Sequence, residues 1–213
     1  MKTSTLTNRM NPANMANLVI KLAVASAMTV FGLSLASCSG SVARTQYLLR
    51  AEAPDRALRV DAPARVGLGR VEVAPYLDQS GIVVEIEPGR VQVASEHQWA
   101  EPLDAGLRTY LRAELSAALG YEVGARVTDP ARWDYTVDVM VETLHGTMAG
   151  TAVIDDAYRV APRTGAAKAV EYRFSRTAAL PRAGYPGLVD AEAALVHELA
   201  ASIADTVGRL SGQ

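Results

Sequence analysis

Cysteine is nearly absent from this chain of 213 residues, which contains a single one, at position 38. One thiol excludes a disulfide within the chain and excludes zinc sites built from several cysteines. Aromatic residues make up only 6% of the sequence, and the formal net charge is -2, so no general basic field attracts a nucleic acid. The hydrophobic fraction of 49% suffices for one domain, or two small ones, with a substantial core.

Acidic residues are missing from the N-terminal segment, where Lys2, Arg9 and Lys21 are the only charged residues before Arg44. An apolar run from Leu22 to Leu35 follows them, and small residues come directly after this run. The order of a basic, an apolar and a small-residue region is typical of a secretory signal peptide. A retained membrane helix fits less well, because the last third of the uncharged stretch consists of Ser, Gly and Cys.

The single cysteine stands where this apolar run ends. Leu35-Ala36-Ser37-Cys38 resembles the lipobox of bacterial lipoproteins, in which the cysteine is acylated and becomes the first residue of the mature chain. The resemblance implies that 1–37 is a cleaved signal peptide and that 38–44 holds the lipidated Cys38 and a tether. Ser39, which is not Asp, implies release to the outer membrane, where three acyl chains would hold the protein without a transmembrane helix. The alternative is that Cys38 is merely a small residue of the cleavage zone.

Hydrophobic periodicity predicts the secondary structure of residues 45–213, which we expect to form one domain. Alternating apolar residues and turn signals predict strands at 46–49, 66–74, 82–87, 91–94, from 135 onward, 151–160 and 169–180. A bulge is expected at Gly69-Arg70 and a turn at Pro88-Gly89. Apolar residues at helical spacing predict helices over 101–119, ended by Gly120, and over 188–210, with Asp190 as its N-cap.

This order of elements, strands then helix and again strands then helix, disfavours a doubly wound parallel sheet, which requires regular alternation. We therefore expect an α+β fold, an antiparallel β-sheet with two α-helices packed on one face, preceded by the lipoprotein signal peptide. On the first helix, Leu111 belongs to the stripe that is expected to be buried, whereas Arg112 lies off it.

Residues suited to catalysis are few and scattered. His197-Glu198 begins like the His-Glu-x-x-His zinc motif, but Ala201 replaces the second histidine, and no Walker loop, nucleophile elbow or dinucleotide fingerprint occurs. Asp155 and Asp156 are adjacent in an expected strand, so their side chains point to opposite faces of the sheet. We expect one to be an exposed carboxylate at the sheet edge and the other to contact a loop. We expect no catalytic residues, no metal site and no cofactor.

Two segments in the middle of the chain carry a resemblance to a known family. Val71 to Asp78 (VEVAPYLD) and Trp99 to Leu103 (WAEPL) resemble the PqiC/YmbA-like family of ABC-type transport auxiliary lipoproteins. The similarity extends over about 45–210, and it departs from the family at Ala157-Tyr158, where a tryptophan is expected before the arginine.

The resemblance implies a non-catalytic, lipid-anchored periplasmic subunit of an MCE-type intermembrane lipid transport system, attached to the outer membrane and supporting membrane integrity. The implied partners are an MCE-domain protein, its associated transporter subunits and the membrane itself through the acyl chains. Whether the protein also forms a homo-oligomer is left open. Tyr76, Leu77 and Trp99 are candidate partner contacts, with core packing as the alternative interpretation. Two other functions remain, a free-standing lipid-binding or envelope-structural lipoprotein and, third, a lipid-processing enzyme.

Overall fold

The computed structural model describes residues 43–51, 57–59, 62, 64–124, 132–163 and 168–212. The predicted signal peptide and Cys38 lie outside these residues. In the part of the chain that is described, no helix is both long enough and apolar enough to cross a membrane.

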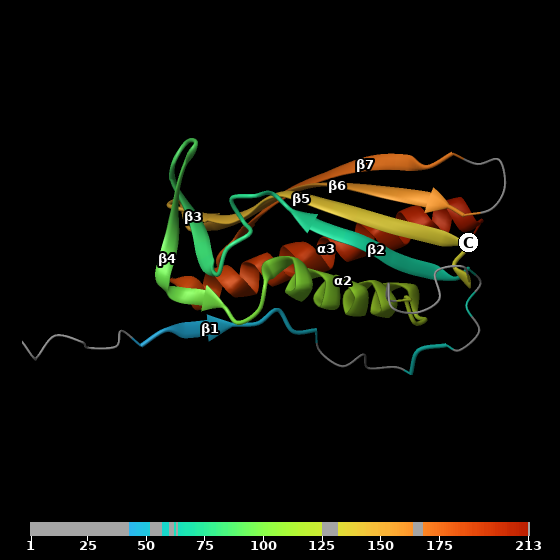
Figure 1. The fold of residues 1–213 in the computed structure, drawn as a ribbon, viewed down its shortest axis with the longest axis horizontal. Coiled ribbons are helices and arrows are strands. Elements are labelled where there is room, and N and C mark those ends of the chain that lie inside the picture. Colours follow the sequence, from blue (N-terminus) through green and yellow to red (C-terminus); the bar gives the residue numbers. More distant parts are fainter. Residues whose placement is uncertain are drawn as a thin grey trace, which may run out of the picture. The chain divides into compact units, whose positions relative to one another are not determined.

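A seven-stranded sheet forms the framework of the domain (Figure 1). Its strands are β1 (Thr45–Tyr47), β2 (Val66–Val73), β3 (Gly81–Glu87), β4 (Arg90–Trp99), β5 (Tyr135–Thr147), β6 (Thr151–Pro162) and β7 (Val170–Ala179). They are joined in the order β1-β4-β3-β5-β6-β7, and β2 also pairs with β5. On one edge of β5, β2 and β3 follow each other, because β2 pairs with Tyr135 to Val141 and β3 with Gly146 and Thr147.

The sheet is mixed, which corrects the expectation of a purely antiparallel one. The β3–β4, β5–β6 and β6–β7 pairs are antiparallel, whereas β1–β4, β2–β5 and β3–β5 are parallel. The parallel β2–β5 pair arises because the intervening helix carries the chain back to the end of the sheet at which β2 began. The α+β class is as expected, and so are the two helices found among the residues of the domain that the structure describes.

The two helices are α2 (Leu103–Leu119) and α3 (Tyr185–Ser211), and both cover the same face of the sheet (Figure 1). The predicted apolar stripe of α2 is buried, with Leu111 at 1% exposure. Gly120 ends this helix with a φ of 73°, in the left-handed region that suits glycine. The Tyr110 hydroxyl donates a hydrogen bond of 3.2 Å to the carbonyl of Ala193, so the helices also contact each other.

The prediction for the start of α3 is wrong. The helix begins at Tyr185, after Gly184 at a φ of 82°, and Pro186 lies in its first turn. Asp190 therefore lies inside the helix, where its carboxylate pairs with Arg182 at 2.8 Å.

The core lies between the helices and one face of the sheet. Alternate residues of β5 and β6 point toward α3, and the Tyr158 hydroxyl lies 3.0 Å from that of Thr206 on this helix. The opposite face of these strands carries polar and charged side chains, including those of Asp138 and Arg159. The sheet thus has one buried and one solvated face, which explains the alternating pattern in the sequence.

Candidate functional site

The predicted partner-contact residues differ in their exposure. Leu77 and Trp99 are 1% and 7% exposed and belong to the hydrophobic core. Tyr76 is only half-buried, and its ring meets that of His145 edge-on at a centroid distance of 6.2 Å. Leu77 and Trp99 therefore expose too little surface to bind a partner, and both pack in the core, the alternative given above. Of the three candidates, only Tyr76 keeps part of its side chain exposed.

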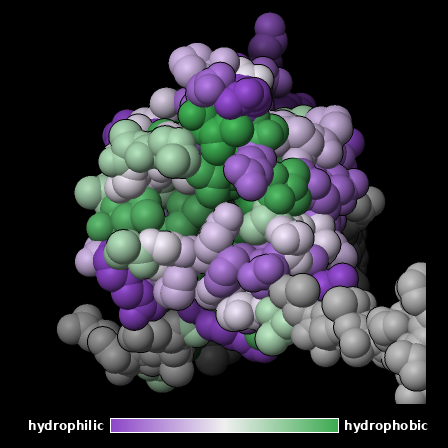
Figure 2. Space-filling model, turned by 90° about the vertical axis from the view of Figure 1, so that its left-hand side faces the viewer, coloured by the Kyte–Doolittle hydropathy of each residue, from purple (hydrophilic) through white to green (hydrophobic). Residues whose placement is uncertain are grey.

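An apolar cavity of about 540 Å³ opens at the end of the domain where α3 begins. We call it the terminal groove, and Figure 2, which faces this end, shows hydrophobic residues gathered there. Its walls come from β3, from the end of β5 and the following turn, and from the segment that leads into α3. The residues that line it are Val84, Gly146, Thr147, Met148, Gly150, Leu180, Arg182, Ala183, Gly184, Tyr185 and Leu188.

Two glycines allow these walls to approach one another. A Cβ at Gly146 would lie 2.7 Å from a methyl group of Leu188, so only glycine allows the first turn of α3 to pack this closely on β5. A Cβ at Gly187 would collide with the backbone carbonyl of Arg182. The segment before α3 is therefore folded tightly back onto the helix, which fixes Arg182 at the border of the groove.

The same end of the domain holds the first strand. Thr45 of β1 pairs with His97 of β4, and the His97 ring stacks on that of Tyr185 at a centroid distance of 4.1 Å. The Tyr47 hydroxyl lies 2.9 Å from Nδ1 of the same histidine. Burial raises the pKa of Tyr47, and the nearby charge of Arg182 opposes this rise. These contacts place the start of β1 beside the terminal groove.

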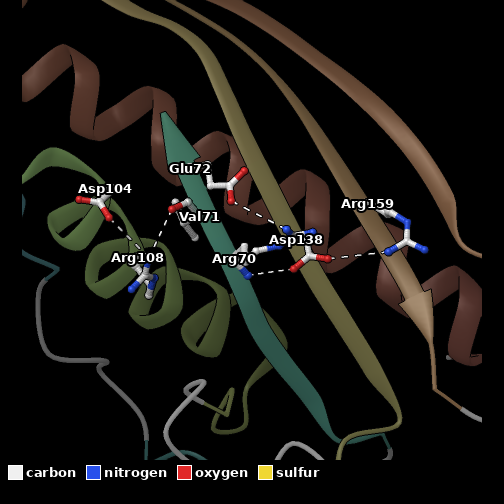
Figure 3. A network of polar contacts seen from close by, with 7 residues as sticks. All are labelled: Arg70, Val71, Glu72, Asp104, Arg108, Asp138 and Arg159. Carbon is white, nitrogen blue, oxygen red and sulfur yellow. Dashed lines mark hydrogen bonds and ion pairs between the residues drawn. The ribbon is translucent and has the colours of Figure 1, made fainter. Parts of the chain in front are cut away.

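A polar network lies on the solvated face of the sheet (Figure 3). The Asp138 carboxylate accepts a hydrogen bond of 2.8 Å from the backbone N–H of Arg70 and forms an ion pair with Arg159 at 3.8 Å. A side chain at Gly69 would collide with this carboxylate. The β2 register shifts at this point, which confirms the predicted bulge. Asp138 thus holds an irregular strand in place.

Arg108 extends this network to α2. Its guanidinium donates a hydrogen bond of 3.3 Å to the carbonyl of Val71 and pairs with Asp104 at 3.6 Å (Figure 3). An ion pair as exposed as this one contributes little to stability. The hydrogen bond to the β2 backbone connects α2 to the sheet, beside the apolar contacts of its buried stripe.

Asp156 is buried, which corrects the expectation of an edge carboxylate and a loop partner for the adjacent aspartates. It lies on β6, between β5 and β7, and is 0% exposed. Neither of its carboxylate oxygens has a hydrogen-bond partner among the residues that the structure describes. Burial raises the pKa of Asp156 to about 7, the negative charges of Asp155 and Glu142 add to this rise, and Arg173 opposes it.

Glu192 is a second buried carboxylate, located on α3 at 1% exposure. Burial raises its pKa to about 8, and its Oε2 has no hydrogen-bond partner within the described ranges. Neither Glu192 nor Asp156 lines the terminal groove. The sequence did carry a signal for Asp156, since it occupies an inward position of an otherwise apolar alternation along β6.

The histidines serve in packing. His197 lies 2.7 Å from the Glu114 carboxylate and so connects α3 to α2, while Nδ1 of the buried His145 lies 3.0 Å from the carbonyl of Gly146. In the described part of the chain, no group of three or more His, Cys, Asp or Glu side chains is arranged to hold a metal ion. Among the described residues, the terminal groove is therefore the feature whose shape best suits a ligand, and its lining matches an apolar one.

Comparison with known proteins agrees with this architecture. The chain is 26% identical to the intermembrane transport lipoprotein PqiC of Escherichia coli K12 over 186 residues, which cover 86% of this chain and 97% of PqiC. The fold is similar to the crystal structure of protein XCC0632 from Xanthomonas campestris, with a TM-score of 0.61 and 19% identity over 79% of this chain and 97% of that one. It is also similar to the crystal structure of an uncharacterized protein, with a TM-score of 0.65 and 24% identity over 78% and 99% of the two chains.

The sequence model of one family matches residues 47–204, which run from the last residue of β1 through β2 to β7 and into α3, as far as residue 204 of that helix. This match confirms the resemblance carried by the VEVAPYLD and WAEPL segments. The protein belongs to the family of ABC-type transport auxiliary lipoprotein components.

Proposed function

We propose that this protein is a non-catalytic, lipid-anchored periplasmic subunit of an MCE-type intermembrane lipid transport system and attaches that system to the outer membrane. The observation that carries the proposal is the extent of the similarity to PqiC, an intermembrane transport lipoprotein, which covers 86% of this chain and 97% of PqiC. An auxiliary role also fits a domain whose polar networks hold strands and helices together.

The terminal groove supports the lipid side of this proposal. Its lining is mostly apolar, and it lies beside the first strand of the domain. In a protein that works next to a lipid carrier at a membrane, apolar surface at the anchored end can contact lipid.

Co-purification tests the proposed partnership. The full-length chain, tagged at its C-terminus and produced in its own host, is isolated from detergent-solubilised envelopes, with an unrelated tagged outer-membrane lipoprotein as the control. We expect an MCE-domain protein to co-purify with the first protein and not with the second. Absence of an MCE-domain protein under conditions that preserve other envelope complexes would contradict the proposal.

The attachment to the outer membrane is proposed to depend on Cys38. Cys38→Ala removes the thiol that the acyl group requires, so the variant should remain as uncleaved precursor in the inner membrane. Fractionation of cells labelled with palmitate measures both effects, and Ser39→Ala is the matched control that should be processed normally. A Cys38→Ala protein that still carries label and reaches the outer membrane would show that the anchor lies elsewhere.

A free-standing lipid-binding lipoprotein is the second candidate, and the terminal groove is the observation that favours it. This function predicts a lipid bound to the protein but no MCE-domain partner in the co-purification. A lipid-processing enzyme is the third candidate; it predicts turnover of phospholipids or esters by the purified protein, for which we expect none.

A further inference from the structure

The terminal groove exposes apolar surface that solvent disfavours. Met148, on the turn that borders it, is 72% exposed, and the cavity volume of about 540 Å³ falls within the range of small-molecule sites. Exposed apolar surface of this kind commonly marks a site that a ligand or partner covers. The shape and lining suit a flexible hydrocarbon chain, which needs volume and dispersion contacts but no hydrogen bonds.

A single charge distinguishes one side of the groove. Arg182 is the one charged residue among the described residues that line it. Its side chain is 63% exposed and pairs with Asp190 at 2.8 Å, a type of contact that contributes little in water. A guanidinium has five N–H donors, so it can bind a phosphate oxygen and keep its contact with Asp190. The groove thus combines an apolar floor with a cation at its border.

The position of the groove brings it close to a membrane. Cys38, the proposed acylation site, precedes Thr45 by seven residues, and an extended chain of this length spans at most about 25 Å. Thr45 pairs with His97, whose ring stacks on Tyr185 in the wall of the groove. An anchored domain therefore holds this opening within a short distance of the bilayer that supplies phospholipids.

We propose that the terminal groove binds one acyl chain of a phospholipid, whose phosphate group contacts Arg182. This assignment rests on the proposed function, since it names a lipid that the transport system would pass to or from this subunit. An occupant without phosphate would leave Arg182 paired, among the described residues, with the exposed Asp190, and a free phosphate would leave the apolar floor of the groove exposed to solvent.

Photo-crosslinking in cells tests the proposal with the full-length chain. A photoreactive phenylalanine analogue replaces Met148 in the groove or, as the matched control, Met140 on the solvated face of β5. Cells are grown with radioactive phosphate, irradiated and lysed, and the purified protein is examined for label. The diacylglyceryl anchor of a lipoprotein contains no phosphorus, so this label reports phospholipid and not the protein's own acyl chains.

We expect a labelled adduct at position 148 that is several times stronger than the one at 140. Arg182→Gln should reduce the label at 148 about twofold to fivefold, the range for an exposed ion pair. Arg173→Gln, which removes an exposed arginine that pairs with Glu142, should leave it unchanged. The analogue in place of Tyr185, the aromatic residue among those that line the groove, gives a second position if the first variant accumulates poorly.

Equal labelling at positions 148 and 140, or no label at 148 and 185, would overturn the proposal. An adduct that mass spectrometry identifies as a bond between position 148 and the protein's own acyl chains, without phosphate, would overturn it as well, because the anchor would then fill the groove. The same cells are examined for a co-purified MCE-domain protein. A phosphate-labelled adduct without that partner supports the groove and contradicts the transport subunit, whereas the partner without the adduct contradicts the groove alone.

Discussion

The buried carboxylate of Asp156 should make the stability of this domain fall as the pH rises. An unfolded chain binds the proton with the ordinary pKa of 3.8, whereas burial raises the pKa of the folded state to about 7. Between these values the folded protein keeps a proton that the unfolded chain has lost. A group that binds protons more tightly in the folded state therefore contributes less stability as the pH rises through this range.

The magnitude follows from the two pKa values. Each pH unit between about 5 and 7 removes about 1.4 kcal/mol from the free energy of unfolding, and the loss ends once the folded carboxyl has ionised. Asp156→Asn keeps the size of the side chain but has no proton to lose. The variant should therefore gain about 3 kcal/mol relative to the unsubstituted protein between pH 5 and pH 8. Glu192 adds a similar slope to both proteins, and its contribution cancels in the comparison.

Urea denaturation at several pH values measures this difference. Trp99 and Trp133 are both 7% exposed, so tryptophan fluorescence reports the loss of the core. Asp155→Asn is the matched control, because this residue is adjacent on the same strand and only half-buried, and it should keep most of the slope. Parallel stability curves for Asp156→Asn and the unsubstituted protein would refute the reasoning, since Asp156 would then titrate alike in the folded and unfolded states.

Three further predictions concern stability and folding. Leu111→Ala should cost about 2 to 5 kcal/mol through lost burial and a residual cavity, whereas Arg112→Ala should cost less than about 0.5 kcal/mol; equal shifts in Tm would show that the α2 stripe is misassigned. Gly187→Ala should lower stability by about 1 to 3 kcal/mol, because its Cβ meets the Arg182 carbonyl; a Tm unchanged by this substitution would contradict the tight fold before α3. Residues 45–213, produced without the preceding segment, should unfold cooperatively in calorimetry without lipid or metal, and failure to fold without lipid would make the cargo part of the core.

Local signals in the sequence predicted the elements that depend on neighbouring residues. The end of α2 at Gly120 and the Pro88-Gly89 turn both rest on a glycine in the left-handed region, with φ values of 73° and 74°. The bulge was recognisable from a glycine inside a strand pattern, at Gly69, where the register of β2 shifts. Such features need no knowledge of the rest of the fold.

The start of α3 was missed although a signal was present. Pro186 suits the first turn of a helix, where its missing N–H is not needed, and it marks the start better than Asp190 does. Asp190 is a good N-cap residue in isolation, but the chain uses its carboxylate to hold Arg182 instead.

The parallel strand pairs and the groove could not be read from the sequence. Periodicity predicts that a segment is a strand, but it does not say which strand lies beside it or in which direction. The groove combines three segments that are distant in the chain, around Val84, 146–150 and 180–188. Its lining comes largely from turns, where apolar residues have no regular spacing. No periodic pattern in the sequence therefore predicts the groove.

The central position of β5 has a consequence for the order in which the domain folds. Its pairing with β6, and the pairing of β6 with β7, join neighbours in the chain, whereas the pairing of β5 with β2 joins residues as far apart as Val66 and Tyr135. Closing such a long loop costs entropy before any contact compensates for it, and pairing of this kind slows folding. The β5–β6–β7 meander is thus the part that can form first. The apolar residues of β2 stay exposed until β5, its pairing partner later in the chain, has been synthesised. A chain that is synthesised from its N-terminus therefore presents an incomplete sheet edge during the period when it is most exposed to aggregation.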